Sequence, residues 1–305
     1  MIVLATSDKG GTGRSVTTTN VAYRRALQGD DVCFLDFDFG SPTAGSIFDV
    51  EAAGRGVKAG SGLHSFLHGE IAEPARIDIW REAGWTGRRR PPGAGRLILL
   101  PGDEGGGEFP VDLDMVGRCR RLLLRLTEEF SVILIDLSAG RSYAAELVQT
   151  ATTGLHSGDI PVRWLVFHRW TRQHILAAAG LVFGEHGIIN NGMALGVSRD
   201  SIESSIRFVR TAVQEPDSAQ LSLLRPTQAS WLQSCHEDLL DLAARRRLGR
   251  SMVAGVIPLD PVLQWHEQII RDHDITSTMI ANAETGHAFD DLARKLTVEN
   301  FWETP

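Results

Sequence analysis

The chain has 305 residues, 43% of them hydrophobic and 23% charged, with a formal net charge of −7 at pH 7. This composition excludes a disordered chain and gives no sign of an anionic partner, and we treat residues 1–305 as one domain. Three isolated cysteines without a CxxC pair argue against a disulfide framework or a metal cluster and favour a reducing, cytoplasmic location. We expect neither a signal peptide nor a transmembrane helix, because the chain opens on a β-type run and holds no stretch of about 20 apolar residues.

Short apolar runs alternate with helical patterns along the chain. The runs expected as strands are MIVLAT, DVCFLDF, RLILLP, SVILIDL, VRWLVFH, MALGVS and MVAGVIP. Helices are expected at about 16–28, 111–130, 141–150, 171–186, 201–214, 228–247, 261–272 and 284–298. Several of these strands are apolar on both faces, as in a sheet covered on both sides. Strands that alternate with helices predict an α/β fold with a mainly parallel twisted sheet and helices on both faces.

Some segments interrupt this rhythm. Residues 51–62 and 84–96 are rich in glycine, proline and arginine, and the whole segment 75–96 is expected as a mobile surface loop. Residues 199–250 are expected to form an insertion with a helical element. Both segments are without a matching motif.

The first 30 residues predict a strand, a glycine turn and a helix that ends near Gly29. Gly10, Gly11 and Gly13 allow the backbone to approach a phosphate, and the amides that open the following helix point towards it. Ser15 is expected to place its hydroxyl on a magnesium ion. The alternative is a tight turn without a ligand.

Lys9 makes the glycine turn more specific. A lysine before two glycines, in KGGxG followed by a basic residue and serine, resembles the deviant Walker A loop of the ParA/MinD family of P-loop ATPases. The resemblance implies Mg-ATP binding, with Thr12 and Val16 completing the loop. It also implies a sandwich homodimer in which Lys9 reaches the nucleotide of the other subunit and takes part in catalysis.

Arg14 departs from the family pattern, which has lysine at this position, and resembles a variant subgroup that carries arginine. Arginine keeps the positive charge but is a longer, planar fork. Nucleotide binding can survive this change, whereas in-line positioning of the γ-phosphate is expected to suffer, because phosphoryl transfer depends on positioning and electrostatics. The alternative is a loop that has become a structural turn.

Acidic residues follow two of the expected strands. Asp36 and Asp38 end the second strand on one face, and Asp136 ends SVILID. By resemblance Asp36 belongs to the metal shell, Asp38 is the candidate catalytic base, and Asp136 holds magnesium as the Walker B residue. Ser138 and Gly140 resemble a switch loop that senses the γ-phosphate. The alternative for Asp36 and Asp38 is that they cap a turn.

Two weaker resemblances extend the match. Residues 62–74 are similar to a family segment that follows the switch region, and VIPLD is similar to the VIPxD tract that borders the adenine. The resemblance therefore places Pro258, Leu259 and Asp260 in the base pocket.

The partners implied are a second copy of the chain and an adaptor or cargo protein in partitioning, positioning or assembly. Basic runs at 87–92 and 244–250 allow weak nonspecific DNA contact, but a solvated charged face is the simpler interpretation. A membrane is not expected, because the polar face of the last helix is mixed in sign; we interpret that helix as closing the domain. The main alternative to a slow ATPase is a pseudo-ATPase scaffold without meaningful turnover. A metallochaperone ranks last because paired cysteines are absent.

Overall fold

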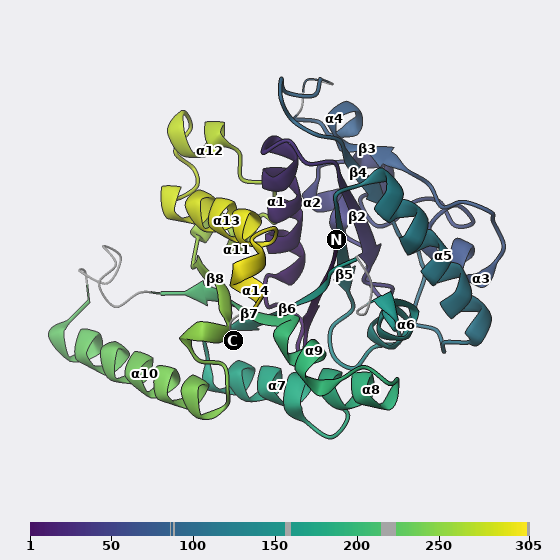
Figure 1. The fold of residues 1–305 in the computed structure, drawn as a ribbon. Helices are drawn as coiled ribbons and strands as arrows, with labels where there is room; N and C mark the ends of the chain where they lie inside the picture. The colour runs from purple at the N-terminus through teal and green to yellow at the C-terminus, as the bar shows by residue number, and fades with distance from the viewer. Residues whose placement is uncertain (86, 88, 156–159, 215–223, 304–305) are drawn as a thin grey trace.

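A computed structural model of the chain describes residues 1–85, 87, 89–155, 160–214 and 224–303. Its strands form one sheet in the order β3-β4-β2-β5-β1-β6-β7-β8 (Figure 1). Each neighbouring pair is parallel except β3 and β4. The strands are β1 (Ile2–Ser7), β2 (Val32–Phe37), β3 (Ile77–Asp78), β4 (Leu97–Leu100), β5 (Val132–Leu137), β6 (Val162–Arg169), β7 (Ile206–Val213) and β8 (Val253–Pro258).

Helices cover both faces of this sheet and form two cores. One core joins the sheet to α3 (Leu63–His68), α5 (Leu113–Glu129), α6 (Tyr143–Thr152), α7 (Arg172–Phe183), α8 (Ile188–Ala194) and α9 (Arg199–Ser204). The other joins it to α1 (Arg14–Leu27), α2 (Ala44–Ile47), α4 (Ile79–Glu82), α13 (Ala283–Lys295) and α14 (Glu299–Glu303). The remaining helices are α10 (Pro226–Arg245), α11 (Pro261–Trp265) and α12 (Asp272–Thr276), with 3-10 turns at Glu51–Ala53 and Arg250–Met252.

The central strands are apolar on both faces, as a covered parallel sheet requires. Every residue of β1, β2 and β5 is buried, and alternate residues of β1 contribute to the two opposite cores. The predicted α/β fold, with a mainly parallel sheet between helical layers, is confirmed.

The helix predicted at 201–214 is wrong, because the chain forms the short helix α9 and then strand β7. Arg207 and Arg210 gave this segment the polar spacing of a helix, but both are buried in the structure. The Arg207 guanidinium donates to the carbonyls of Phe301 and Trp302 at 2.8 and 3.0 Å. Residues 199–250 are therefore not a simple insertion, since they supply a strand of the sheet.

Three further expectations need correction. The run MALGVS is not a strand, because α8 extends to Ala194 and the chain turns at Gly196, whose φ is 89°. The helix predicted at 261–272 is interrupted between α11 and α12, where the Asn20 side chain bonds the backbone of Gln268 and Ile270. The segment 75–96 is not loop throughout, since it contains β3 and α4 with a buried Trp80.

The last described helices close the domain, as predicted. Trp302 in α14 is 1% exposed, and its indole N–H donates to the carbonyl of Leu296 at 3.1 Å. The guanidinium of Arg163 lies 4.9 Å from the centre of its ring. Within the described ranges, none of the helices has both the length and the apolar character needed to cross a bilayer.

Replacing Trp302 with alanine is expected to lower the free energy of unfolding by about 3–5 kcal/mol, because it removes a large buried ring and leaves a cavity. Urea titration followed by circular dichroism measures this loss. Trp265→Ala is the matched control: this tryptophan is 92% exposed, so its removal should change stability by less than about 0.5 kcal/mol. Equal effects of the two variants would contradict the packing role of Trp302.

Candidate functional site

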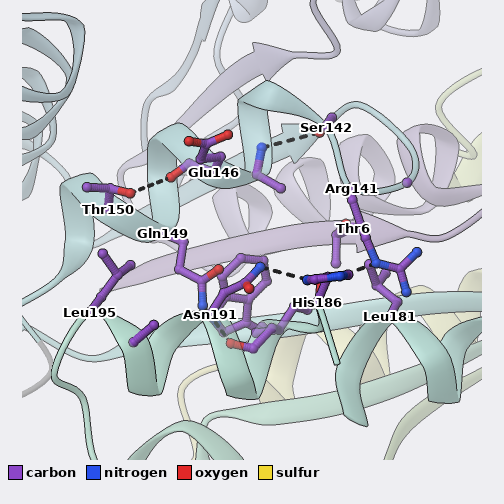
Figure 2. Close-up of a pocket in the computed structure, with 15 residues that line it drawn as sticks. Thr6, Arg141, Ser142, Glu146, Gln149, Thr150, Leu181, His186, Asn191 and Leu195 are labelled. Atoms are coloured by element: carbon purple, nitrogen blue, oxygen red, sulfur yellow. Dashed lines mark hydrogen bonds between the residues drawn. The ribbon is translucent and has the colours of Figure 1, made fainter. Parts of the chain in front are cut away.

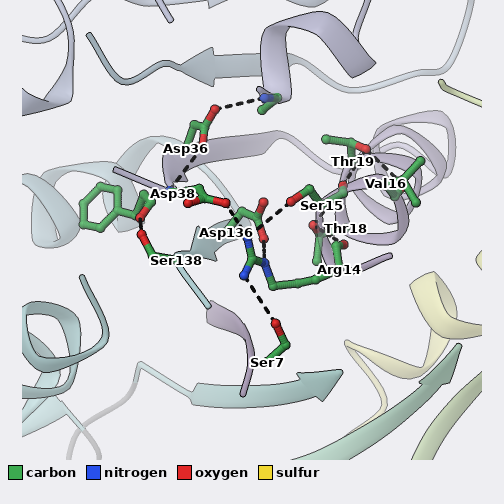
Figure 3. Close-up of polar contacts among 12 residues, drawn as sticks. Ser7, Arg14, Ser15, Val16, Thr18, Thr19, Asp36, Asp38, Asp136 and Ser138 are labelled. Atoms are coloured by element: carbon green, nitrogen blue, oxygen red, sulfur yellow. Dashed lines mark hydrogen bonds and ion pairs between the residues drawn. The ribbon is translucent and has the colours of Figure 1, made fainter. Parts of the chain in front are cut away.

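The predicted site residues meet at the carboxyl end of the central strands (Figure 3). Asp36 of β2 and Asp136 of β5 are direct neighbours in the sheet register, and Ala5 of β1 pairs with Asp136 on the other side. The glycine loop follows β1 and leads into α1. In open α/β sheets this edge is where ligands bind.

Two glycines of the loop have left-handed backbone conformations. Gly11 and Gly13 have φ values of 69° and 72°, which glycine adopts without strain. The Thr211 hydroxyl donates to the carbonyl of Thr12 at 2.5 Å and fixes the loop against β7. A Cβ atom at Gly10 or Gly11 would meet nothing within 4 Å, so the outer side of the loop is open. An anion can therefore approach the loop and the first amides of α1.

Arg14 is the first residue of α1, and its side chain turns inward towards the carboxylates (Figure 3). The side chain is 6% exposed; its Nε lies 2.5 Å from Oδ1 of Asp136 and a terminal nitrogen lies 2.8 Å from Oδ2 of Asp38. Weaker contacts reach the hydroxyls of Ser7 and Ser15 at 3.4 and 3.3 Å. Together these contacts use four of the five N–H donors of a guanidinium.

The remaining predicted metal residues are also bonded within the protein. The Ser15 hydroxyl hydrogen-bonds the carboxylate of Asp136. Asp36 is 1% exposed, and its two oxygens accept from the backbone amides of Ala44 and Asp38 at 2.9 and 3.3 Å. Asp36 thus shapes the turn after β2, which agrees with the capping alternative, while its role in a metal shell stays a prediction.

The electrostatics follow from burial and from the crowding of carboxylates. Burial, with the neighbouring charge of Asp136, raises the pKa of Asp36 to about 8. Burial also raises the pKa of Asp136, although Arg14 and Ser15 counteract this effect. For Arg14, burial works to lower the pKa, but Asp136 and Asp38 outweigh it and raise the pKa. The guanidinium therefore keeps its charge and balances the carboxylates around it.

The raised pKa of Asp36 predicts a pH-dependent stability. The ordinary pKa is 3.8, so between about pH 4 and pH 8 the folded protein holds a proton that the unfolded chain has lost. The contribution of Asp36 to stability must therefore decrease as the pH rises through this range. Asp36→Asn should reduce the difference in unfolding free energy between pH 5 and pH 8, measured by urea titration. The exposed Asp114→Asn control should keep the wild-type difference, and an unchanged difference in Asp36→Asn would contradict the raised pKa.

A magnesium ion, as implied by the fold, does not fit these residues as they stand. Asp136 and Asp38 offer oxygen ligands of the right kind, but both are bound to the Arg14 guanidinium. Two unit charges 4 Å apart repel by about 4 kcal/mol at an effective dielectric constant of about 20, and a divalent ion doubles this cost. In the part of the chain that the structure describes, no group of three or more His, Cys, Asp or Glu residues is arranged to hold a metal.

Two of the three predicted base-pocket residues lie beside the glycine loop. A pocket of about 170 Å³ is lined by Gly11, Thr12 and Gly13 of the loop, Val16 of α1, Pro258 at the end of β8 and Asp260 after it. Leu259 is not among its lining residues. Asp260 caps α11, and its second oxygen accepts from Asn282 and Thr285, so it shapes the pocket wall and has no oxygen to spare. The volume is below the ~300 Å³ typical of small-molecule sites, so the pocket would enclose only part of a nucleotide.

The residues predicted to face a partner or sense phosphate lie at this edge but differ in exposure, since Ser138 is buried. Lys9 is exposed, and Ser138 and Gly140 form the loop after β5, where the Gly140 amide donates to the carbonyl of Ser7 at 2.7 Å. The same loop, residues 138–142, borders two hollows. One, of about 420 Å³, lies between α6, α7 and α8 (Figure 2). The other, of about 510 Å³, includes Asp38.

Sequence reasoning missed two residues of this site. Ser7 contacts Arg14, and Thr211 bonds the loop carbonyl of Thr12. Thr211 was hidden because its segment was predicted as a helix, and a small hydroxyl residue at a strand end carries little signal of its own. The strained Ala212, with a φ of 50°, lines the same small pocket and marks a bulge in β7. A predicted strand at 206–213 would have placed these residues at the ligand edge.

The chain has the P-loop NTPase fold of MinD and ParA proteins. A scan against protein-family models and a search of curated proteins gave no match. Among solved structures, the chain is similar to one from the MinC:MinD cell division protein complex of Aquifex aeolicus, with a TM-score of 0.60 and 16% identity over 97% of this chain and 95% of that one.

Two further similarities cover nearly the whole chain. MinD of Pyrococcus horikoshii, complexed with Mg-ADP, gives a TM-score of 0.52 at 17% identity, covering 98% of this chain and 96% of that one. A putative plasmid partition protein of Borrelia burgdorferi, bound to AMPPNP, gives 0.58 at 12% identity and covers 96% of each chain. At these identities the similarity shows the fold alone.

Proposed function

We propose that this chain is a MinD/ParA-like protein that binds ATP at the glycine loop and forms an ATP-dependent sandwich homodimer. The dimer would act on an adaptor or cargo protein in partitioning, positioning or assembly. One observation carries the proposal: an open glycine loop, the start of α1 and the exposed Lys9 lie together at the ligand edge of the sheet. The MinD and partition proteins of the same fold, solved with Mg-ADP or AMPPNP, support a nucleotide at this edge.

Turnover by this protein is proposed to be slow. Asp38 is the candidate base, but its Oδ2 accepts from Arg14 at 2.8 Å. A general base must be free to reach the water that it activates, and this contact engages one of the two Asp38 oxygens. The same contact favours the second candidate function, a pseudo-ATPase scaffold, whose phosphate release would not exceed that of a blank.

The dimer is tested by size-exclusion chromatography with light scattering, with and without ATP. The wild type should elute as a dimer with ATP and as a monomer without it. Lys9→Ala should remain monomeric, whereas Lys58→Ala, which removes another exposed lysine, should behave as the wild type. The same elution volume and mass with and without ATP would contradict the proposed ATP-dependent homodimer.

Cytoplasmic location and weak DNA contact remain part of this proposal. Of the two basic runs, 87–92 lies partly outside the described residues. In the other, Arg247 pairs with Glu203 and stacks on Phe183, so part of this basic run is engaged within the protein. This arrangement supports the interpretation as a charged face more than a dedicated DNA surface.

A further inference from the structure

The inference concerns what Arg14 does at the site, and it starts from the elements that hold its side chain. The guanidinium lies between β5, which carries Asp136, and the segment after β2, which carries Asp38. Ser7 at the end of β1 and Ser15 in α1 contact its terminal nitrogens. A single side chain therefore joins four segments of the chain at the point where the carboxyl ends of three strands meet (Figure 3).

The partners of the guanidinium are the residues that the sequence predicts for a metal ion and for the attacking water. Asp136 and Ser15 were expected to hold magnesium, and Asp38 was expected to orient the water. In the structure Asp136 accepts from Arg14 and from the Ser15 hydroxyl. The positive charge of Arg14 thus lies against the oxygens that a divalent cation would use.

Arginine suits this position for chemical reasons. Its planar guanidinium offers donors on two edges, so one cation binds two carboxylates at once. It does not lose its proton in proteins and, unlike a metal ion, does not dissociate. Because the side chain is almost fully buried and the carboxylates would be left unpaired without it, leaving this position carries a large cost.

We propose that the Arg14 guanidinium takes the place of the divalent cation, so that this chain binds a nucleoside triphosphate without metal. This inference rests on the proposed nucleotide binding. The loop amides would hold the phosphates, while Arg14 would keep Asp136 and Asp38 paired, so that these carboxylates repel the phosphates less in the absence of metal. Metal would add no affinity, because the carboxylates that would bind it are already engaged.

The first test needs no variant. Binding of a fluorescent ATP analogue to the full chain is measured in Mg2+ and in EDTA, and the two dissociation constants should agree within about twofold. Binding weakened about tenfold or more in EDTA overturns the proposal. If the analogue binds in neither condition, the proposed nucleotide binding fails. The second test then shows by itself whether Arg14 occupies the place of the cation.

The second test measures metal binding directly, on nucleotide-free protein. Titration with Mn2+ is followed by electron paramagnetic resonance, which reports the free ion. The wild type should leave the Mn2+ signal unchanged, whereas Arg14→Gln should bind Mn2+ at the released carboxylates, with circular dichroism confirming its fold. Arg141→Gln removes a nearby charge that faces Asp8 and should behave as the wild type. Binding of Mn2+ by the wild type, or equal lack of binding in wild type and Arg14→Gln, overturns the proposal.

Discussion

Arg14→Gln should lower the free energy of unfolding by about 3–5 kcal/mol, because removing one partner of a buried ion pair leaves the other charge unpaired. Arg14 is 6% exposed and Asp136 is 1% exposed, so water cannot replace the lost contact. Urea titration at pH 7 measures the change. This would make a residue at the end of the glycine loop one of the larger contributors to the stability of the fold.

A second substitution separates the loss of the ion pair from the other effects of Arg14→Gln on the free energy of unfolding. Asp136→Asn in the Arg14→Gln background should recover part of the lost stability, because the unpaired buried charge is gone. Arg141→Gln should change stability by less than about 1 kcal/mol, since Arg141 is 48% exposed and its bonds to the carbonyls of Gly180 and His186 are exposed as well. A double variant that is no more stable than Arg14→Gln would contradict a stabilising pair between Arg14 and Asp136.

Arg14→Lys should raise the rate of phosphate release in Mg-ATP about tenfold or more, because a general base commonly contributes two or more powers of ten. Lysine offers a compact ammonium in place of the two-edged fork and cannot hold Asp136 and Asp38 in the same way. Asp38 would be free to orient water, and Asp136 would be free to bind metal. A coupled phosphate assay under single-turnover conditions measures the rate.

The control is Asp38→Asn in the Arg14→Lys background, which should return phosphate release to the wild-type level. ATP binding is measured for the wild type, Arg14→Lys and the double variant, so that each rate is compared for ATP-bound protein. If Arg14→Lys binds ATP but releases phosphate no faster, Asp38 is not placed to act as a base. The pseudo-ATPase scaffold would then be the better account.

Most strands of the sheet, namely β1, β2, β4, β5, β6 and β8, could be predicted because they are short apolar runs bounded by turn residues. Strand β7 could not, because Arg207 and Arg210 occupy buried positions that a pattern of polar and apolar residues assigns to the surface. Their burial depends on carbonyl partners far away in the chain, such as Phe301 and Leu248. Local spacing carries no information about such partners.

The place of the site was predictable, but the state of Arg14 was not. The glycine loop follows β1, and the three aspartates lie at or just beyond the ends of β2 and β5, so topology alone brings them to one edge. Whether a guanidinium faces a phosphate or a carboxylate depends on the balance of charges in three dimensions. The available signal was a basic residue in a loop that topology brings beside three carboxylates, since a buried charge needs a partner.

The loop of residues 138–142 lies between two hollows of the surface. Arg141 and Ser142 line both the hollow beside Asp38 and the one between α6, α7 and α8. A ligand that displaced this segment beside Asp38 would therefore also change a wall of the hollow between α6, α7 and α8.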